Sequence, residues 1–415
     1  MARLLALCVI AMALLAPPAA AVDSTDGDDG GRGSRCRGFD SQNDHNERSG
    51  ATSHRSSPDY YRHQLCLDLN QTQVIGTHNS YKQPIPPPLL EVLGGLFPDL
   101  ALSLEYSHAP LPEQFDEQEV RQIEIDVYHD PDGGLFAARP ALDALGLPNE
   151  TPPELLEPGF KVLHINDIDF NSSCLTLVDC LTEVRRWSRS HRGHLPIMIL
   201  IELKTDPIPD PLNLGFVTPL PIGPTELDAL DAEIRSVFKD RHTIDPEEVR
   251  GRYKTLEEAV LAGNWPSLWR SRNKVLFTMV NGGEARDDYL AGHPSLDGRV
   301  MFTNSTPGQP DAAFLNVDDA ITNRQRIQDL VAAGYIVRTR ADVDTIEGRT
   351  GDTTRLEAAL ASGAQWVSTD YPVPGRAFVD YSATIPEGDP ARCNPVNTGP
   401  RCRNDRLERI RIRRR

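Results

Sequence analysis

The sequence predicts a (β/α)8 TIM barrel, which need not be regular. Eight short apolar runs of β type follow one another over about three hundred residues, and eight is the number of strands that a closed parallel barrel needs. Several segments between these runs have the apolar spacing of an amphipathic helix. Polar side chains stand at the C-terminal ends of several runs, where barrel enzymes carry their active sites.

The expected strands are short and mostly apolar. A doubly wound open sheet is the structural alternative, but no Gly-x-Gly-x-x-Gly turn follows the first run. In chain order the expected strands are residues 73–76, 122–127, 161–164, 197–203, 274–279, 299–303, 335–338 and 365–368.

The segments between the later strands are predicted to be helices. Two of them end at a glycine, Gly334 and Gly363, and an apolar run follows almost at once. A glycine just past the last helical turn is typical of the junction between a helix and the next strand of a β/α unit. The apolar positions that keep the spacing of one helix face are Leu227, Leu230, Ile234 and Val237 in one segment and Ile327, Leu330 and Val331 in another.

The ends of the chain differ from its middle in composition. Residues 1–21 have a basic start, a short apolar stretch and an Ala-x-Ala ending, and so predict a secretory signal peptide and an extracellular protein. Residues 22–57 are rich in Asp, Gly, Ser and Arg and predict a disordered leader. The barrel is expected over residues 58–385. Residues 386–415 form a basic tail, read either as a frayed terminus or as a contact for anionic polymers or lipids.

Charge and cysteine content limit the functions that are possible. The net charge of -17 argues against a nucleic-acid partner, and no protein partner is evident. Removal of the signal peptide leaves six cysteines, an even number that suits disulfides in an oxidising compartment. Six cysteines allow fifteen connectivities, of which the simplest joins neighbours: Cys36 with Cys66, Cys174 with Cys180 and Cys393 with Cys402.

Acidic and imidazole side chains gather at the expected barrel mouth. Glu124 and Asp126 are one residue apart in a strand, so they point to the same face. Together with Asn79 and Glu202 they offer only oxygen ligands, which suits Ca2+ or Mg2+ and argues against zinc. Without a cation, crowded carboxylates would raise one another's pKa. Two further groups at strand ends, His78 and His164, are suited to proton transfer near neutral pH.

Five segments carry a resemblance to a known family. They are residues 73–83 (QVIGTHNSYKQ), 121–130 (RQIEIDVYHD), 161–180, 196–204 (PIMILIELK) and 367–372 (VSTDYP). These segments resemble the calcium-dependent phosphatidylinositol-specific phospholipase C family of secreted bacterial and fungal enzymes, which has a barrel of the type found in phospholipase-C-like phosphodiesterases. The resemblance implies that His78 and His164 are catalytic. It also implies that Asn79, Glu124, Asp126 and Glu202 bind Ca2+.

The resemblance further implies the substrate and the reaction. The enzyme would act on phosphatidylinositol at a membrane or micelle surface, where an inositol hydroxyl attacks phosphorus and diacylglycerol leaves. His164 is favoured as the general acid, and either His78 or Glu124 as the base. We expect Lys204 to contact the phosphate. The residues expected to hold the inositol ring are Arg338, Arg340, Asp370 and Tyr371.

Two other functions remain open at this point. A glycerophosphodiester phosphodiesterase also combines a barrel with a Glu-x-Asp metal pair, but its first strand ends in His-Arg-Gly, and this chain has His78, Asn79 and Ser80 there. A catalytically idle lipid- or glycan-binding barrel is the second alternative, and the presence of both imidazoles and all the carboxylates argues against it. The apolar segment 85–97 is read either as a lipid-contacting loop or as a helix packed on the barrel.

Overall fold

The computed structural model describes residues 65–386, 390–400, 402–408 and 411–412. The expected signal peptide and leader lie outside these residues, and so does Cys36, the expected partner of Cys66. Among the described residues, no helix is both long and apolar enough to cross a bilayer.

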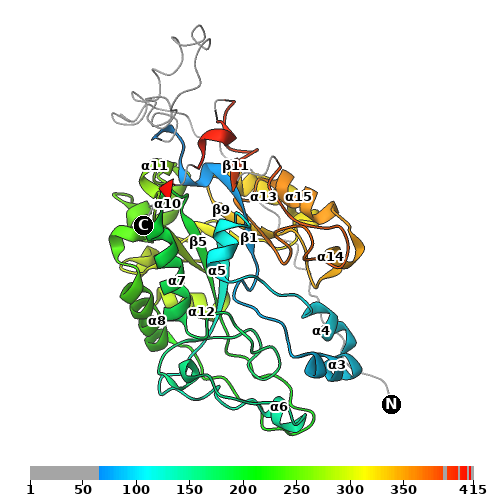
Figure 1. Ribbon diagram of the computed structural model, residues 1–415. Helices are drawn as coiled ribbons and strands as arrows, with labels where there is room; N and C mark the ends of the chain where they lie inside the picture. Colours follow the sequence, from blue (N-terminus) through cyan, green and yellow to red (C-terminus); the bar gives the residue numbers. More distant parts are fainter. Residues whose placement is uncertain (1–64, 387–389, 401, 409–410, 413–415) are drawn as a thin grey trace, which may run out of the picture. The chain divides into compact units, whose positions relative to one another are not determined.

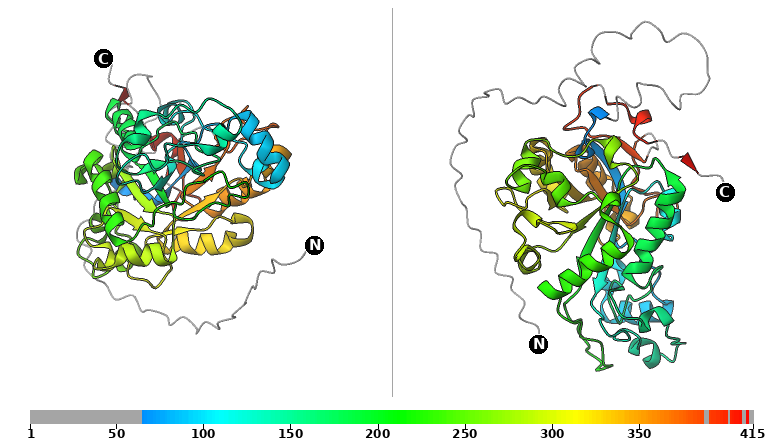
Figure 2. Two further views of the ribbon diagram at one scale, coloured as in Figure 1. Left: turned by 90° about the horizontal axis from the view of Figure 1, so that it is seen from below. Right: turned by 90° about the vertical axis from the view of Figure 1, so that its left-hand side faces the viewer.

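Eight parallel strands form a nearly closed barrel, in the order β7-β6-β5-β2-β1-β10-β9-β8. β7 and β8 are the first and last strands in this order. A single parallel bridge, between Asn304 and Phe314, connects them and nearly closes the barrel. Figures 1 and 2 show the strands at the centre with helices around them. The predicted barrel is confirmed. Its strands are β1 Thr72–Thr77, β2 Gln122–Tyr128, β5 Ile197–Leu203, β6 Val275–Met279, β7 Met301–Thr303, β8 Phe314–Asn316, β9 Ile336–Arg340 and β10 Trp366–Thr369.

One expected strand was wrong. Residues 161–164 do not form a parallel barrel strand: only β3 (Lys161–Val162) is extended, and it pairs antiparallel with β2, outside the barrel order. The missing place is taken by β8, which sequence analysis overlooked. β8 has three residues and follows a polar stretch rich in Gly and Pro, so it lacks the length from which a strand can be recognised.

Helices pack their apolar sides against the strands. α8 buries Leu227, Leu230 and Ile234, as its apolar spacing predicts. α13 and α15 end at Gly334 and Gly363, whose φ angles of 110° and 76° lie in the left-handed region that favours glycine. The helices are α3 Pro87–Leu96, α4 Pro98–Ser103, α5 Leu111–Asp116, α6 Pro140–Ala144, α7 Leu177–Ser190, α8 Pro224–Val237, α9 Pro246–Arg250, α10 Leu256–Leu261, α11 Leu268–Ser271, α12 Gly283–Leu290, α13 Ala320–Ala333, α14 Ile346–Thr350 and α15 Thr354–Ser362.

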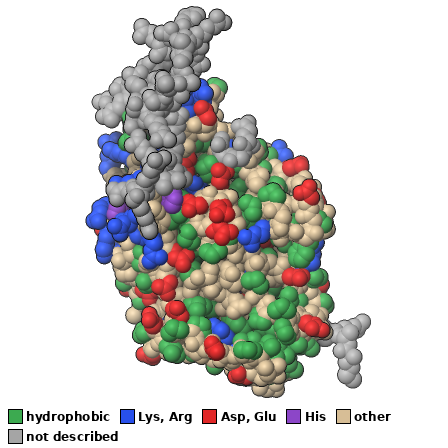
Figure 3. Space-filling model, viewed as in Figure 1, with side chains coloured by type: hydrophobic (Ala, Val, Ile, Leu, Met, Phe, Trp, Pro, Cys, Tyr) green, Lys and Arg blue, Asp and Glu red, His purple; other side chains and the backbone are tan. Residues whose placement is uncertain are grey.

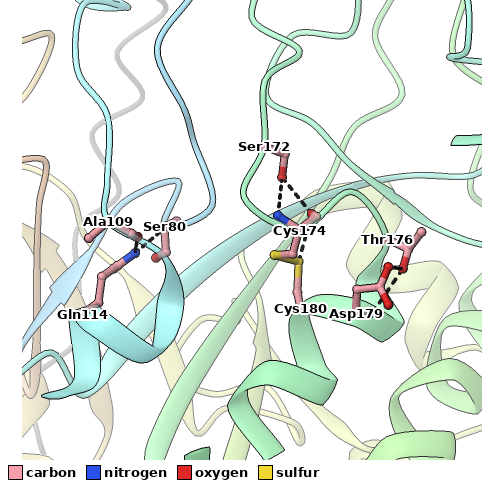
Figure 4. Close-up of a disulfide and its surroundings, with 8 residues drawn as sticks. All are labelled: Ser80, Ala109, Gln114, Ser172, Cys174, Thr176, Asp179 and Cys180. Atoms are coloured by element: carbon pink, nitrogen blue, oxygen red, sulfur yellow. Dashed lines mark hydrogen bonds between the residues drawn. A yellow bond between two sulfur atoms is a disulfide. The ribbon is translucent and has the colours of Figure 1, made fainter. Parts of the chain in front are cut away.

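Two of the expected disulfides are confirmed. Cys174 and Cys180 are joined with their Cα atoms 5.2 Å apart, which is possible because Cys174 precedes α7 and is not part of it. Figure 4 shows this bridge beside Thr176, whose side chain caps α7 by accepting a hydrogen bond from the backbone N–H of Asp179. The second bridge joins Cys393 and Cys402.

The described residues after 390 pack against the N-terminal ends of the barrel strands. β11 (Ala391–Cys393) pairs antiparallel with β1, and the short strand β12 (Arg411–Ile412) pairs with β4 (His191–Arg192). The carboxylate of Glu408 accepts hydrogen bonds from Arg121 Nε at 2.9 Å and from the backbone N–H of Leu195 at 2.9 Å. We call these contacts of Glu408 with Arg121 and Leu195 the N-terminal clasp.

A second, smaller core lies at the opposite end of the barrel. It is built around α3 and α4, which are inserted between β1 and β2 and lie beside the C-terminal ends of the strands (Figure 1). α3 buries Leu89 and Leu93 in this core. Its other side, with α4, leaves Leu96, Phe97 and Leu102 between 43% and 49% exposed. The segment is therefore mainly a packed helix with apolar side chains on its outer surface, and contact of this surface with lipid stays a prediction.

Candidate active site

The predicted polar residues come together at one end of the barrel because parallel strands bring their C-terminal ends to the same rim. His78 and Asn79 follow β1 directly, and Asp370 follows β10. Asp126 in β2 lies opposite Glu202 in the register of β2 and β5. Asn79 adopts a left-handed backbone with φ of 48°, a conformation that asparagine tolerates better than most residues.

Three carboxylates form the centre of the site. Glu124, Asp126 and Glu202 each offer an oxygen, and these oxygens all lie within 4.8 Å of one another. Glu124 and Asp126 are buried. Burial, with the charge of Glu202, raises the pKa of Asp126, and burial raises the pKa of Glu124 to about 7. The sequence-based expectation that these acids raise one another's pKa therefore agrees with the geometry.

The cluster has the unsatisfied oxygens that a cation site requires. Neither carboxylate oxygen of Asp126 accepts a hydrogen bond, and the buried side-chain oxygen of Asn79 has no partner among the described residues. Buried polar atoms are almost always hydrogen-bonded, so oxygens without a partner beside a carboxylate cluster are suited to coordinate a cation. An all-oxygen donor set with two or more carboxylates fits Ca2+.

Two basic side chains already contact the cluster. Lys204 Nζ lies 3.3 Å from Asp126 Oδ2 and 3.3 Å from Glu202 Oε1. Burial works against the charged form of Lys204, but the two carboxylates outweigh it and raise its pKa. On the other side, Arg338 Nη2 donates to Glu124 Oε2 at 2.7 Å.

His78 is held by groups on both ring nitrogens. Its Nδ1 is 2.9 Å from Asp370 Oδ1, and Arg340 Nη1 is 3.3 Å from its Nε2. A guanidinium can only donate, so Nε2 is the acceptor and the ring proton is on Nδ1, toward Asp370. Burial and the charge of Arg340 lower the pKa of His78 well below its usual value. His78 is thus a neutral imidazole whose Nε2 is a hydrogen-bond acceptor.

His164 is held differently. Its Nδ1 lies 2.7 Å from Asp169 Oδ2, and Lys82 Nζ lies 3.2 Å from the same oxygen. Lys82 is completely buried and also donates to the backbone carbonyls of Leu104 and Tyr106. His164 therefore has a carboxylate partner on Nδ1, and that carboxylate is anchored by a buried ammonium.

Sequence analysis missed Tyr106, Asp169 and Lys82. The hydroxyl of Tyr106 accepts a hydrogen bond from Asn79 Nδ2 at 2.9 Å and lies 3.2 Å from His78 Nδ1. Asp169 stands five residues after His164, a spacing that could have drawn attention to it. Nothing in the sequence distinguishes Tyr106, because the chain reaches the site there from the end of α4.

Two of the residues expected to bind inositol, Arg338 and Tyr371, make contacts with other parts of the protein. The guanidinium of Arg338 bonds Glu124, Ser368 and Asp318. Tyr371 is buried against Tyr381 in a small aromatic cluster, and its ring fills the space beside Gly348. Arg340, which pairs with Asp370 at 3.1 Å and contacts His78, remains at the site itself.

The chain is similar to several solved structures at low sequence identity. A calcium-dependent phosphoinositol-specific phospholipase C from Pseudomonas sp. is 15% identical, covering 80% of this chain and 96% of its own, with a TM-score of 0.48. A Ca2+-dependent phosphatidylinositol-specific phospholipase C from Streptomyces antibioticus is 19% identical, covering 74% and 95%, with a TM-score of 0.46. No curated protein matches the chain.

The family assignment rests on a family model that covers most of the chain. The model described as phosphoinositide phospholipase C, Ca2+-dependent, matches residues 67–395. This confirms the expected family and its dependence on calcium. The chain belongs to the Ca2+-dependent phosphoinositide phospholipase C family and is a phosphatidylinositol-specific phospholipase C.

Proposed function

We propose that this enzyme is secreted and cleaves phosphatidylinositol at a lipid surface, between glycerol and phosphate, to release diacylglycerol. The observation that carries the proposal is that two imidazoles, each bonded to its own carboxylate, share one barrel rim with a carboxylate cluster. The backbone carbonyl of His164 accepts a hydrogen bond from the hydroxyl of Tyr128, the last residue of β2, at 3.0 Å, so His164 lies beside the strand that carries Glu124 and Asp126. The site thus holds a proton acceptor and a proton donor near one set of metal-binding oxygens.

His78 serves as the base in this proposal. Its neutral Nε2 can take the proton of the inositol hydroxyl that attacks phosphorus. Glu124 was the other candidate, but its carboxylate belongs to the cluster that would hold Ca2+. Arg338 then acts by positioning Glu124, and Arg340, at Nε2 of His78, faces the phosphate.

His164 serves as the general acid toward the diacylglycerol oxygen. The Nδ1–H directed at Asp169 leaves Nε2 as the nitrogen that can face the substrate, and the carboxylate stabilises the imidazolium. Asn79, Glu124, Asp126 and Glu202 would hold Ca2+, which when bound polarises phosphoryl oxygens and acidifies a neighbouring hydroxyl. Lys204, which lies among these carboxylates, adds positive charge where the phosphate docks.

The proposed location rests on two observations. The disulfides Cys174–Cys180 and Cys393–Cys402 suit an oxidising compartment outside the cytoplasm. The exposed apolar side chains of α3 and α4 lie on the same side of the barrel as the site, and Figure 3 shows hydrophobic side chains gathered over this region. Such a surface suits contact with the apolar part of a lipid layer.

A product analysis tests the proposal. Phosphatidylinositol in mixed micelles is incubated with the enzyme, with and without Ca2+, and the water-soluble phosphorus compounds are identified by phosphorus NMR. We expect an inositol phosphate, cyclic or opened by water, only with Ca2+ present. Glycerophosphocholine serves as a control, because it has no inositol hydroxyl to attack phosphorus. Hydrolysis of glycerophosphocholine at the rate of phosphatidylinositol would favour the glycerophosphodiester phosphodiesterase.

A further inference from the structure

A cavity of about 700 Å3 lies between α3, α4 and the segment that follows α4. Its walls include Ile85, Leu90, Ala101 and Leu104. Every charged side chain that lines it is acidic, namely Glu91 and Glu105. The volume is within the range of sites for small organic ligands, about 300–1,000 Å3. Glu105 is paired with Arg349 at 2.6 Å, no basic side chain among the described residues lines the cavity to hold a phosphate, and the apolar walls suit an uncharged, apolar group.

The cavity adjoins the active site through Tyr106. This residue lines the cavity, and its hydroxyl contacts Asn79 and His78. The backbone carbonyls of Leu104 and Tyr106 also accept hydrogen bonds from Lys82, which pairs with Asp169 beside His164. The cavity therefore adjoins both imidazoles: it reaches His78 through Tyr106, and it reaches His164, the general acid toward the diacylglycerol oxygen in the proposed reaction, through Lys82 and Asp169.

The cavity is also continuous with the exposed apolar surface. Leu102 lines the cavity and is 46% exposed, and Leu96 and Phe97 are exposed on the same helix pair. A hydrocarbon chain could pass from a lipid layer into the cavity along apolar side chains. A free anionic headgroup or a polar peptide would meet the acidic residues instead.

We infer that this cavity binds one hydrocarbon chain of the lipid substrate, on the leaving-group side of the scissile bond. The inference rests on the proposed function and adds to it a site for the acyl part of the substrate. Burial of apolar surface in such a cavity strengthens binding by about fourfold for each methylene group that enters.

Two neighbouring glycines of α3 provide a matched pair of variants. Gly94 lines the cavity, and a Cβ placed there would meet only Ala101 Cβ, at 3.9 Å, which is ordinary contact. Gly95 does not line the cavity, and a Cβ there would meet nothing within 4 Å. Gly94→Phe should thus occupy the cavity, and Gly95→Phe should place the same side chain outside it.

The test measures kcat/KM on soluble, monomeric phosphatidylinositols with chains of four to eight carbons and on glycerophosphoinositol, which has no chains. For the wild type we expect kcat/KM to rise about fourfold for each methylene that enters the cavity. Gly94→Phe should remove most of this rise and leave turnover of glycerophosphoinositol within about twofold, whereas Gly95→Phe should behave as the wild type. The same chain-length dependence in Gly94→Phe as in the wild type would overturn the inference.

A second measurement does not depend on any variant folding. Isothermal titration calorimetry of the wild type with monomeric dioctanoylglycerol should detect one binding site, and absence of binding would contradict the cavity's role. A different result would contradict the proposed function. If the wild type cleaved neither glycerophosphoinositol nor any phosphatidylinositol, the proposed reaction would be wrong. Cleavage without chain-length dependence would overturn only the chain site.

Discussion

The two rims of the barrel each bury a carboxylate, and the two carboxylates have opposite environments. At the N-terminal rim, Glu408 accepts hydrogen bonds from Arg121 and Leu195. Burial works against its charge, but Arg121 outweighs burial and lowers its pKa. At the C-terminal rim, Asp126 is equally buried, neither of its oxygens accepts a hydrogen bond, and burial with Glu202 raises its pKa.

This difference separates stability from function. A buried charge with its hydrogen-bond partners in place belongs to the fold, because removing one partner would leave the other charge buried and uncompensated. A buried carboxylate such as Asp126, whose oxygens accept no hydrogen bond and which has only the longer contact with Lys204, lowers stability. Proteins retain such groups chiefly where a ligand completes them. The following predictions test whether the C-terminal rim depends on a ligand and the N-terminal clasp does not.

The largest expected effect is the loss of activity when calcium is removed. Excess EDTA should abolish turnover of phosphatidylinositol, because the crowded carboxylates repel one another unless a cation lies between them. Added Ca2+ should restore it. Asp126→Asn should raise the Ca2+ concentration needed for half-maximal turnover. Full turnover in EDTA would mean that Lys204 and Arg338 are sufficient counter-charges by themselves.

The next effect concerns the two imidazoles. His78→Ala and His164→Ala should each lower kcat by about 10²- to 10⁴-fold, the usual contribution of a general acid or base. Calcium binding, measured by calorimetry, should be retained in both. His293→Ala, at a half-buried histidine outside the site, is the control and should keep wild-type turnover. Wild-type turnover in either site variant would remove that histidine from the mechanism.

A smaller effect, on stability, is expected at the N-terminal clasp. Glu408→Gln should lower the free energy of unfolding by about 3–5 kcal/mol, because it leaves the buried Arg121 without its counter-charge. At temperatures where the protein is folded, kcat should not change. Asp240→Asn, in the exposed pair with Arg235, is the control and should cost at most about 1 kcal/mol. A loss of kcat in folded Glu408→Gln would contradict the separation of the two rims.

The smallest effect is a pH dependence of opposite sign at the two rims. At the C-terminal rim, burial and the charge of Asp370 raise the pKa of Asp342 to about 7. The folded state then binds more protons, and this group's contribution to stability is lost as pH rises from about 4 to 7. Near the clasp, burial lowers the pKa of His194 to about 4. Its contribution is lost as pH falls from about 6.5 to 4.

Urea unfolding between pH 4 and 7 measures this contrast. Relative to Asp342→Asn, the wild type should lose stability as pH rises. Relative to His194→Gln, it should gain stability over the same range. If both differences in the free energy of unfolding, wild type against Asp342→Asn and wild type against His194→Gln, changed with pH in the same direction, the two rims would not differ in this way.

The sequence predicted the parts of the molecule that depend on local pattern. The apolar runs of β2 and β5 identified both strands and placed Glu124, Asp126 and Glu202 on a common rim. The short β8 has too few residues for a pattern, and residues 161–164 were apolar enough to take its place in the count. Tertiary pairing, which the sequence does not display, decided between them.

The rest of the site depended on contacts between distant segments. Tyr106 and Lys82 reach His78 and Asp169 only because α3 and α4 turn the chain back toward the rim. The tail was judged by its average charge, which is basic. This average hid Glu408, an acid whose contacts with Arg121 and Leu195 connect the tail to the barrel. The average composition of a segment indicates how well it is solvated, but it does not reveal a single buried ion pair within it.

The pairing of β1 has a consequence for how the protein is made. β1 is synthesised first among the barrel strands, yet it pairs with β10 and β11, and Gln73 bonds Arg392, 319 residues later. One edge of β1 therefore stays open until nearly all of the described chain has been synthesised. Contacts this distant in sequence form slowly. A chain that cannot close its barrel early remains unfolded for longer during synthesis, which is the state in which an extended polypeptide can be threaded across a membrane.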